Sequence, residues 1–182
     1  MSSHVHTPSQ VVQAVRRKVP TVVVVRRPAE SVVSLVIAAP HVPLDLALRE
    51  WIDHYRRLWP LRDGFVIATF EQATTDVGAV IRRVNQRFGS AIPDFVHDEQ
   101  SEGGAQNLME VDHERYHASD PLSAPWPTAS RNTARRRLTT ELSRPAFEIL
   151  LARADSLYEA YAGHSESVRD AEGCPSRAES PR

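Results

Sequence analysis

The stretch PTVVVVRRPAESVVS, residues 20–34, decides the fold of this chain. Its four consecutive valines, Val22 to Val25, form a β-branched run without polar alternation. Such a run is typical of a strand buried on both faces, as in a parallel sheet. Pro28 suits the first position of a helix because its φ is already helical, and Val32 and Val33 begin that helix's apolar side. The stretch therefore predicts a buried strand that turns directly into a helix.

Similar signals recur on both sides of this unit. The run FVIATF, residues 65–70, predicts a second buried strand. Apolar side chains recur at helical spacing over residues 8–18, 44–59 and 76–88, and Gly89 is placed to end the last of these helices. The order of strand, helix, helix, strand and helix predicts a layered α/β domain with a mainly parallel sheet, in which the two strands are parallel and are neighbours or near-neighbours.

The second half of the chain carries weaker signals. Between residues 90 and 130 the periodicity fades, which predicts a long loop. A helix resumes near Arg131 and is interrupted at Pro145. After it, the Ser, Glu and Arg composition is typical of disorder. We therefore expect one α/β domain over residues 1–162 and a disordered tail over residues 163–182.

Composition excludes several classes of protein. The chain has 182 residues, enough for one domain. Its formal net charge of −1 argues against a dedicated nucleic-acid binder. A single cysteine, Cys174, cannot form an intrachain disulfide and fits a reducing cytoplasm. No apolar run approaches the roughly 20 residues of a membrane span.

The candidate binding residues are Arg26 and Ser34. Arg26 follows the carboxyl end of the first strand, where ligands of open α/β sheets bind, and a helix begins directly after it. Helix N-termini attract phosphate. Ser34 lies two turns into that helix, ~9 Å along it, so one phosphate could touch both side chains. The alternative interpretation is a solvated arginine at a strand end and a hydroxyl on a helix surface.

The same segment resembles a family signature. PAPS-dependent sulfotransferases carry Arg-[Asp/Asn]-Pro-x-[Asp/Glu]-x-x-x-Ser after an apolar strand, and Arg26, Pro28, Glu30 and Ser34 fall on it in order. The resemblance implies that Arg26 and Ser34 hold the 3′-phosphate of the co-substrate PAPS. Arg27 departs from the signature, because it stands where the family has Asp or Asn. We therefore expect this turn to be capped differently.

Weaker matches extend the resemblance over roughly residues 4 to 162. The family often has Lys-x-His-x-Pro upstream, and the sequence HVHTP aligns His6 with its catalytic base. Phe70 and Glu71 resemble an aromatic-Glu pair at the end of the family's next strand. The resemblance, which is to bacterial members in particular, implies a three-layer P-loop NTPase-like fold and no metal. It also implies transfer of a sulfuryl group from PAPS to a hydroxyl or amine acceptor.

One large element of the family has no counterpart here. Sulfotransferases begin with a strand, a Lys-[Ser/Gly]-Gly-[Ser/Thr]-[Ser/Thr] loop that cradles the 5′-phosphosulfate, and a helix; Lys18 has no glycine near it. We expect an N-terminally truncated protein that is inactive as it stands. Its incomplete sheet should expose apolar surface, and a homo-oligomer could bury that surface. The alternative is a non-catalytic remnant, or a partner-binding module of the same fold.

A second alternative is a zinc hydrolase. His113, Glu114 and His117 match the His-Glu-x-x-His pattern, in which two histidines on one helix face bind zinc and the glutamate activates water. The surrounding residues argue against it, because glycines and a proline flank a helix that should be long and buried. No third protein ligand is determined by the sequence.

Overall fold

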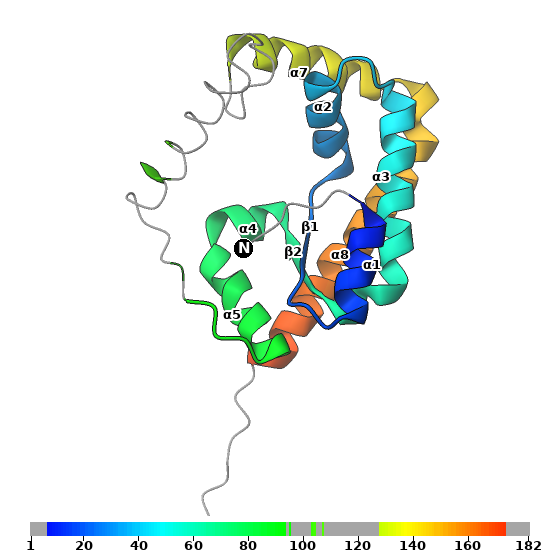
Figure 1. Ribbon diagram of the computed structural model, residues 1–182. Coiled ribbons are helices and arrows are strands. Elements are labelled where there is room, and N and C mark those ends of the chain that lie inside the picture. The colour runs from blue at the N-terminus through cyan, green and yellow to red at the C-terminus, as the bar shows by residue number, and fades with distance from the viewer. Residues whose placement is uncertain (1–6, 94, 96–102, 105–106, 108–127, 174–182) are drawn as a thin grey trace, which may run out of the picture.

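A computed structural model describes residues 7–93, 95, 103–104, 107 and 128–173 of the chain. It is rich in helix and holds a two-stranded sheet (Figure 1). In chain order the elements are α1 (Pro8–Arg16), β1 (Val22–Val25), α2 (Pro28–Ala38), α3 (Leu44–Leu58), the 3₁₀ helix η1 (Trp59–Gly64), β2 (Val66–Thr69), α4 (Phe70–Thr75), α5 (Val77–Phe88), α7 (Ala129–Leu142), the 3₁₀ helix η2 (Pro145–Phe147) and α8 (Glu148–Gly173).

The sheet confirms the predicted pairing of the two apolar runs. Strands β1 and β2 are parallel neighbours, with Val22 opposite Val66 and Val25 opposite Thr69. The molecule is therefore a helix-rich α/β structure, as the element order predicted. A P-loop NTPase-like fold would need more strands than the two that the structure describes.

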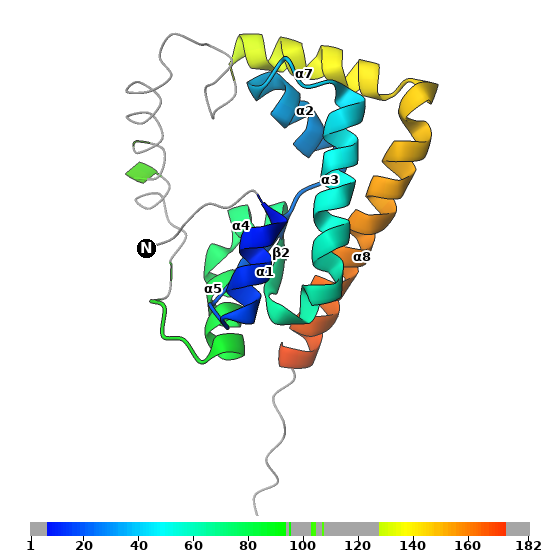
Figure 2. The same ribbon diagram turned by 45° about the vertical axis from the view of Figure 1, so that its right-hand side comes forward.

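Helices cover the two faces of the sheet unequally. One face of β1 and β2 carries Val23, Val25 and Ile67, which belong to the main core together with apolar residues of α2, α3, α7 and α8. On the opposite face α4 and α5 lie against β2, where Val66 and Ala68 are buried (Figure 1). In Figure 2, α7 lies across the far end of α2, and α3 and α8 run side by side.

The second strand, predicted over residues 65–70, is shorter by one residue at each end. Phe70 was expected to end it, but Phe70 is the first residue of α4. The reason is a capping box: the Thr69 hydroxyl accepts a hydrogen bond from the Gln72 N–H, and the Gln72 side chain accepts one from the Thr69 N–H. This reciprocal pair satisfies two otherwise unpaired helix donors, so the chain turns into a helix immediately after Thr69.

The prediction of a disordered tail from residue 163 is wrong for residues 163–173, which continue α8. Composition indicated disorder there, but a tertiary contact explains the helix. Ser165 is fully buried, and its Oγ lies 2.9 Å from the Ile67 carbonyl oxygen and 3.1 Å from Gln72 Oε1. Residues 174–182 lie outside the described part of the chain.

Two tyrosines, the half-buried Tyr55 and the buried Tyr161, join α3, α8 and β1. The Tyr55 hydroxyl donates a hydrogen bond to the Val24 carbonyl oxygen at 3.0 Å, and the Tyr161 hydroxyl donates one to the Tyr55 carbonyl oxygen at 2.8 Å. Burial raises the pKa of Tyr55 to about 12, and burial also raises the pKa of Tyr161. Both hydroxyls are therefore held neutral in the folded protein.

This burial predicts a loss of stability at alkaline pH. The unfolded chain releases the Tyr55 proton near pH 10, whereas the folded chain retains it, so the stabilisation is complete below pH 10 and falls as pH rises toward 12. We expect Tyr55 alone to account for on the order of 2 kcal/mol of that fall. Urea denaturation between pH 8 and 12 measures it. The stability gap between the wild type and Tyr55→Phe should narrow over this range, and a constant gap would contradict the prediction.

Candidate functional site

Strand register places Arg26 beside Phe70 at the carboxyl end of the sheet. Val25 and Thr69 are the last paired residues, so the next residue of each strand lies side by side with the other. The Arg26 guanidinium carbon lies 4.3 Å from the centre of the Phe70 ring. This is close enough for a cation–π contact. This contact could not be predicted from the sequence, because it depends on which residues of the two strands pair.

A carboxylate holds the edge of the same guanidinium. Arg26 Nε donates to Glu30 Oε2 at 3.1 Å, and the Arg26 side chain is 24% exposed. Glu30 lies in the first turn of α2, where a negative charge also interacts favourably with the helix dipole. Arg26 is therefore not a freely solvated strand end, which was the alternative interpretation of its position.

The N-terminus of α2 carries no side-chain cap. Arg27 is the N-cap residue and accepts no hydrogen bond through its side chain, and Pro28 follows as the first helical residue. An uncapped helix N-terminus beside an arginine has the two features that attract an anion: unpaired N–H groups and positive charge.

Arg27 points to the other side of the sheet. Its guanidinium lies 5.0 Å from the centre of the Tyr158 ring, and its Nη1 lies 3.8 Å from Glu159 Oε1, both on α8. Successive residues of an extended chain point to opposite faces, which separates Arg27 from Arg26. The two neighbouring arginines thus have different roles: Arg27 binds α8, and Arg26 is left at the rim of the opposite face.

Ser34 lies on the same side of α2 as the Arg26 contact. Residues four apart on a helix share one face, so Ser34 follows directly behind Glu30, which holds Arg26. Ser34 is half-buried, and its hydroxyl makes no hydrogen bond to another residue of the described part. The structure therefore brings the two predicted binding residues onto one side of one helix.

The remaining predicted site residues cannot be placed. His6, and the possible zinc set of His113, Glu114 and His117, lie outside the described residues. Within the described residues, no group of three or more histidine, cysteine, aspartate and glutamate side chains could hold a metal ion. A search of the same residues finds no helix that is long and apolar enough to cross a membrane.

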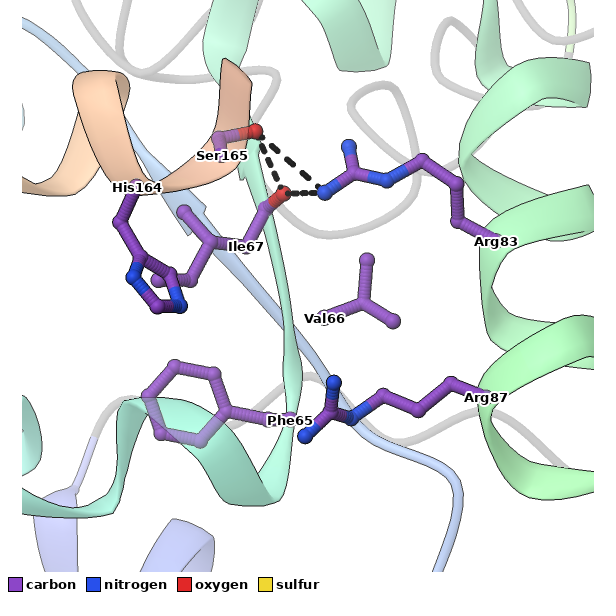
Figure 3. A pocket seen from close by; sticks show the side chains of 7 residues that line it. All are labelled: Phe65, Val66, Ile67, Arg83, Arg87, His164 and Ser165. Carbon is purple, nitrogen blue, oxygen red and sulfur yellow. Dashed lines mark hydrogen bonds between the residues drawn. The ribbon is translucent and has the colours of Figure 1, made fainter. Parts of the chain in front are cut away.

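The outer edge of β2 is closed by side chains. Figure 3 shows Arg83 of α5 and Ser165 of α8 pointing at the Ile67 carbonyl oxygen, with their donor atoms 2.8 and 2.9 Å from it. The next backbone N–H of β2 that points away from β1 is that of Thr69, and it donates a hydrogen bond to Gln72 Oε1 at 3.0 Å. The cavity between these side chains has a volume of about 10 Å³, room for one water molecule. It is not a ligand site.

The outer edge of β1 is open by comparison. The Val66 N–H donates a hydrogen bond to the Thr21 carbonyl, so the backbone groups of Thr21 point toward β2. Backbone groups of successive strand residues point in alternate directions, so those of Val22 and Val24 point away from β2. Of the described residues, only Tyr55 donates to these groups, at the Val24 carbonyl. The side chains of Val22 and Val24 are 38% and 41% exposed. An exposed apolar edge of this kind can accept another strand.

A larger cavity lies at the opposite end of α2 from Arg26. Its volume is about 280 Å³, and its walls come from α2, the start of α3 and α7. The lining is apolar apart from Arg137 and Glu141, a composition that is usual for a small-molecule pocket. Neither of the two binding residues predicted from the sequence, Arg26 and Ser34, lines this cavity.

Comparison with known proteins leaves the site to be interpreted from its own geometry. The chain matches no protein-family model, no curated protein and no solved structure.

Proposed function

We propose that this chain is a sulfotransferase-like domain that binds the nucleotide of PAPS, with Arg26 and Ser34 on its 3′-phosphate. The observation that carries the proposal is the position of Arg26. It lies at the carboxyl end of a parallel strand, beside the uncapped N-terminus of α2, on the side of that helix that also carries Ser34. A phosphate there would interact with a guanidinium, a helix dipole and a free hydroxyl.

The open edge of β1 supports the finer fold proposal. A three-layer P-loop NTPase-like fold needs further parallel strands. The backbone groups of Val22 and Val24 point away from β2, and among the described residues only the Val24 carbonyl has a partner there, the Tyr55 hydroxyl. We propose that a strand, loop and helix that bind the 5′-phosphosulfate pack at this edge. Without amides and a cation at the departing phosphate, the largest electrostatic contribution to transfer is missing. The described residues would then supply the 3′ side of the nucleotide site.

The proposed reaction follows from the family resemblance. The oxygen or nitrogen of the acceptor attacks the sulfur of PAPS, and the bond from sulfur to the 5′-phosphate oxygen breaks, which releases PAP. His6 would take the acceptor's proton as general base, the role that its match to the family pattern implies.

The direct test compares two nucleotides that differ in one group. Isothermal calorimetry of the chain with PAP and with adenosine 5′-phosphate isolates the 3′-phosphate, because only PAP carries it. We expect PAP to bind on the order of 30-fold or more tightly than adenosine 5′-phosphate, the effect of one charge-assisted contact. Equal affinities would remove the basis for the proposal.

Equal affinities would instead favour the second candidate function, a partner-binding module of the same fold. The specific observation behind that candidate is the same open edge of β1, which can accept a strand from another molecule.

A further inference from the structure

We propose that Glu30 and Phe70 are positioning residues that hold the Arg26 guanidinium in a single orientation, with its two Nη groups presented to an oxyanion. This inference rests on the proposed function and deepens it, because it names the chemistry that the arginine selects. The expected ligand group is a terminal phosphate monoester, which can offer two oxygens to the two Nη groups at once.

Phe70 fixes the plane of the guanidinium. The parallel register sets Arg26 beside Phe70, and the guanidinium carbon lies 4.3 Å from the ring centre. The backbone of Phe70 is held in place, because Phe70 begins α4 directly after the Thr69–Gln72 capping box. One face of the guanidinium is therefore covered by an aromatic ring whose point of attachment is fixed.

Glu30 fixes the rotation of the guanidinium within that plane. It accepts a hydrogen bond from Nε at 3.1 Å, and Nε lies at the opposite end of the group from the Nη pair. Within the described residues, neither Nη atom of Arg26 has a partner. With Nε and one face occupied, the two Nη groups remain as a fork without a partner among the described residues, and such a fork can bind two oxygens of one anion.

A competing interpretation makes Glu30 an obstacle, because its negative charge repels an anion and engages the same arginine. Two observations favour the positioning role. Glu30 binds Nε and leaves both Nη atoms unoccupied, so an anion can bind without displacing it. The Glu30 side chain is 46% exposed, and water lowers the repulsion between charges at a protein surface. The two interpretations predict opposite effects when Glu30 is removed.

The binding experiment uses two pairs of variants with PAP as the probe. We expect Glu30→Ala and Phe70→Leu to weaken PAP binding by about 3- to 10-fold, the loss expected when one long side chain must be ordered on binding. Glu30→Gln keeps an acceptor for Nε, and Phe70→Tyr keeps the ring, so both should stay within about twofold of the wild type. Glu159→Ala is the matched control, because it removes a carboxylate from Arg27 on the other side of the sheet.

A second measurement needs no ligand and separates the two proposals. The ¹⁵N heteronuclear NOE of the Arg26 Nε–H group in the free protein reports its rigidity. It should be high in the wild type and fall in Glu30→Ala and Phe70→Leu. A wild type that does not bind PAP but keeps a rigid, Glu30-dependent Nε–H would overturn the proposed function and not the positioning role. PAP binding that is unchanged or tighter in Glu30→Ala, or an Nε–H that is mobile in the wild type, would overturn the positioning role alone.

Discussion

Arg26→Ala is expected to weaken PAP binding by roughly 30- to 150-fold, which corresponds to about 2–3 kcal/mol. The substitution removes the guanidinium that lies at the rim between β1, α2 and Phe70. Calorimetry with PAP measures the change, and adenosine 5′-phosphate should respond little, because it lacks the 3′ group.

Three variants serve as controls for that result. Arg27→Ala removes the same charge from the neighbouring residue, but Arg27 contacts α8, so binding should change by less than about threefold. Ser34→Ala should cost about 1 kcal/mol, since water can replace a neutral hydroxyl. His6→Ala should leave nucleotide binding nearly unchanged, because a general base acts on the acceptor. Equal losses in Arg26→Ala and Arg27→Ala would show that net charge, and not the Arg26 contact, governs binding.

Tyr161→Ala is expected to lower the free energy of unfolding by about 3–5 kcal/mol. Tyr161 is fully buried, and its ring contacts those of Tyr55 and Trp59 at centre-to-centre distances of 5.4 and 4.9 Å. Truncation to alanine leaves a cavity at the place where α8 joins α3, and buried aromatic rings cannot rearrange to fill it without strain. Urea denaturation at pH 7 measures the loss.

Tyr161→Phe is the matched control for the cavity. It removes only the hydrogen bond to the Tyr55 carbonyl, and that oxygen also accepts from the Trp59 N–H, so it is not left unpaired. We therefore expect a loss of about 1 kcal/mol. If Tyr161→Ala cost no more than Tyr161→Phe, then α8 would not be packed against α3 as the structure shows.

Much of the local structure follows from the sequence because its causes are local. Four consecutive valines favour an extended chain, Pro28 begins α2, and Asp76 caps α5 through the Ala79 N–H. Gly89 ends α5 with a φ of 61°, in the left-handed region that glycine enters without steric cost. The parallel pairing of the strands was also predictable, because each is followed by helix and no hairpin turn connects them.

The candidate site was predictable in part. The position of Arg26 at the carboxyl end of a strand, and of Ser34 in the following helix, follows from the order of elements. The partners of Arg26 did not follow from it. Phe70 stands 44 positions further along the chain, and only the register of β1 against β2 brings it beside the guanidinium.

Local signals in the sequence were sufficient to predict β1, α2 and α5, and to predict that the two strands run parallel in a layered core. Tertiary structure alone decided three further features: the helical course of residues 163–173, the closing of the β2 edge by Arg83 and Ser165, and the orientation of Arg26. The physical reason is the range of the interactions. Backbone propensity and capping act within a few residues, whereas a buried hydroxyl or a stacked guanidinium finds its partner only after distant segments have packed together.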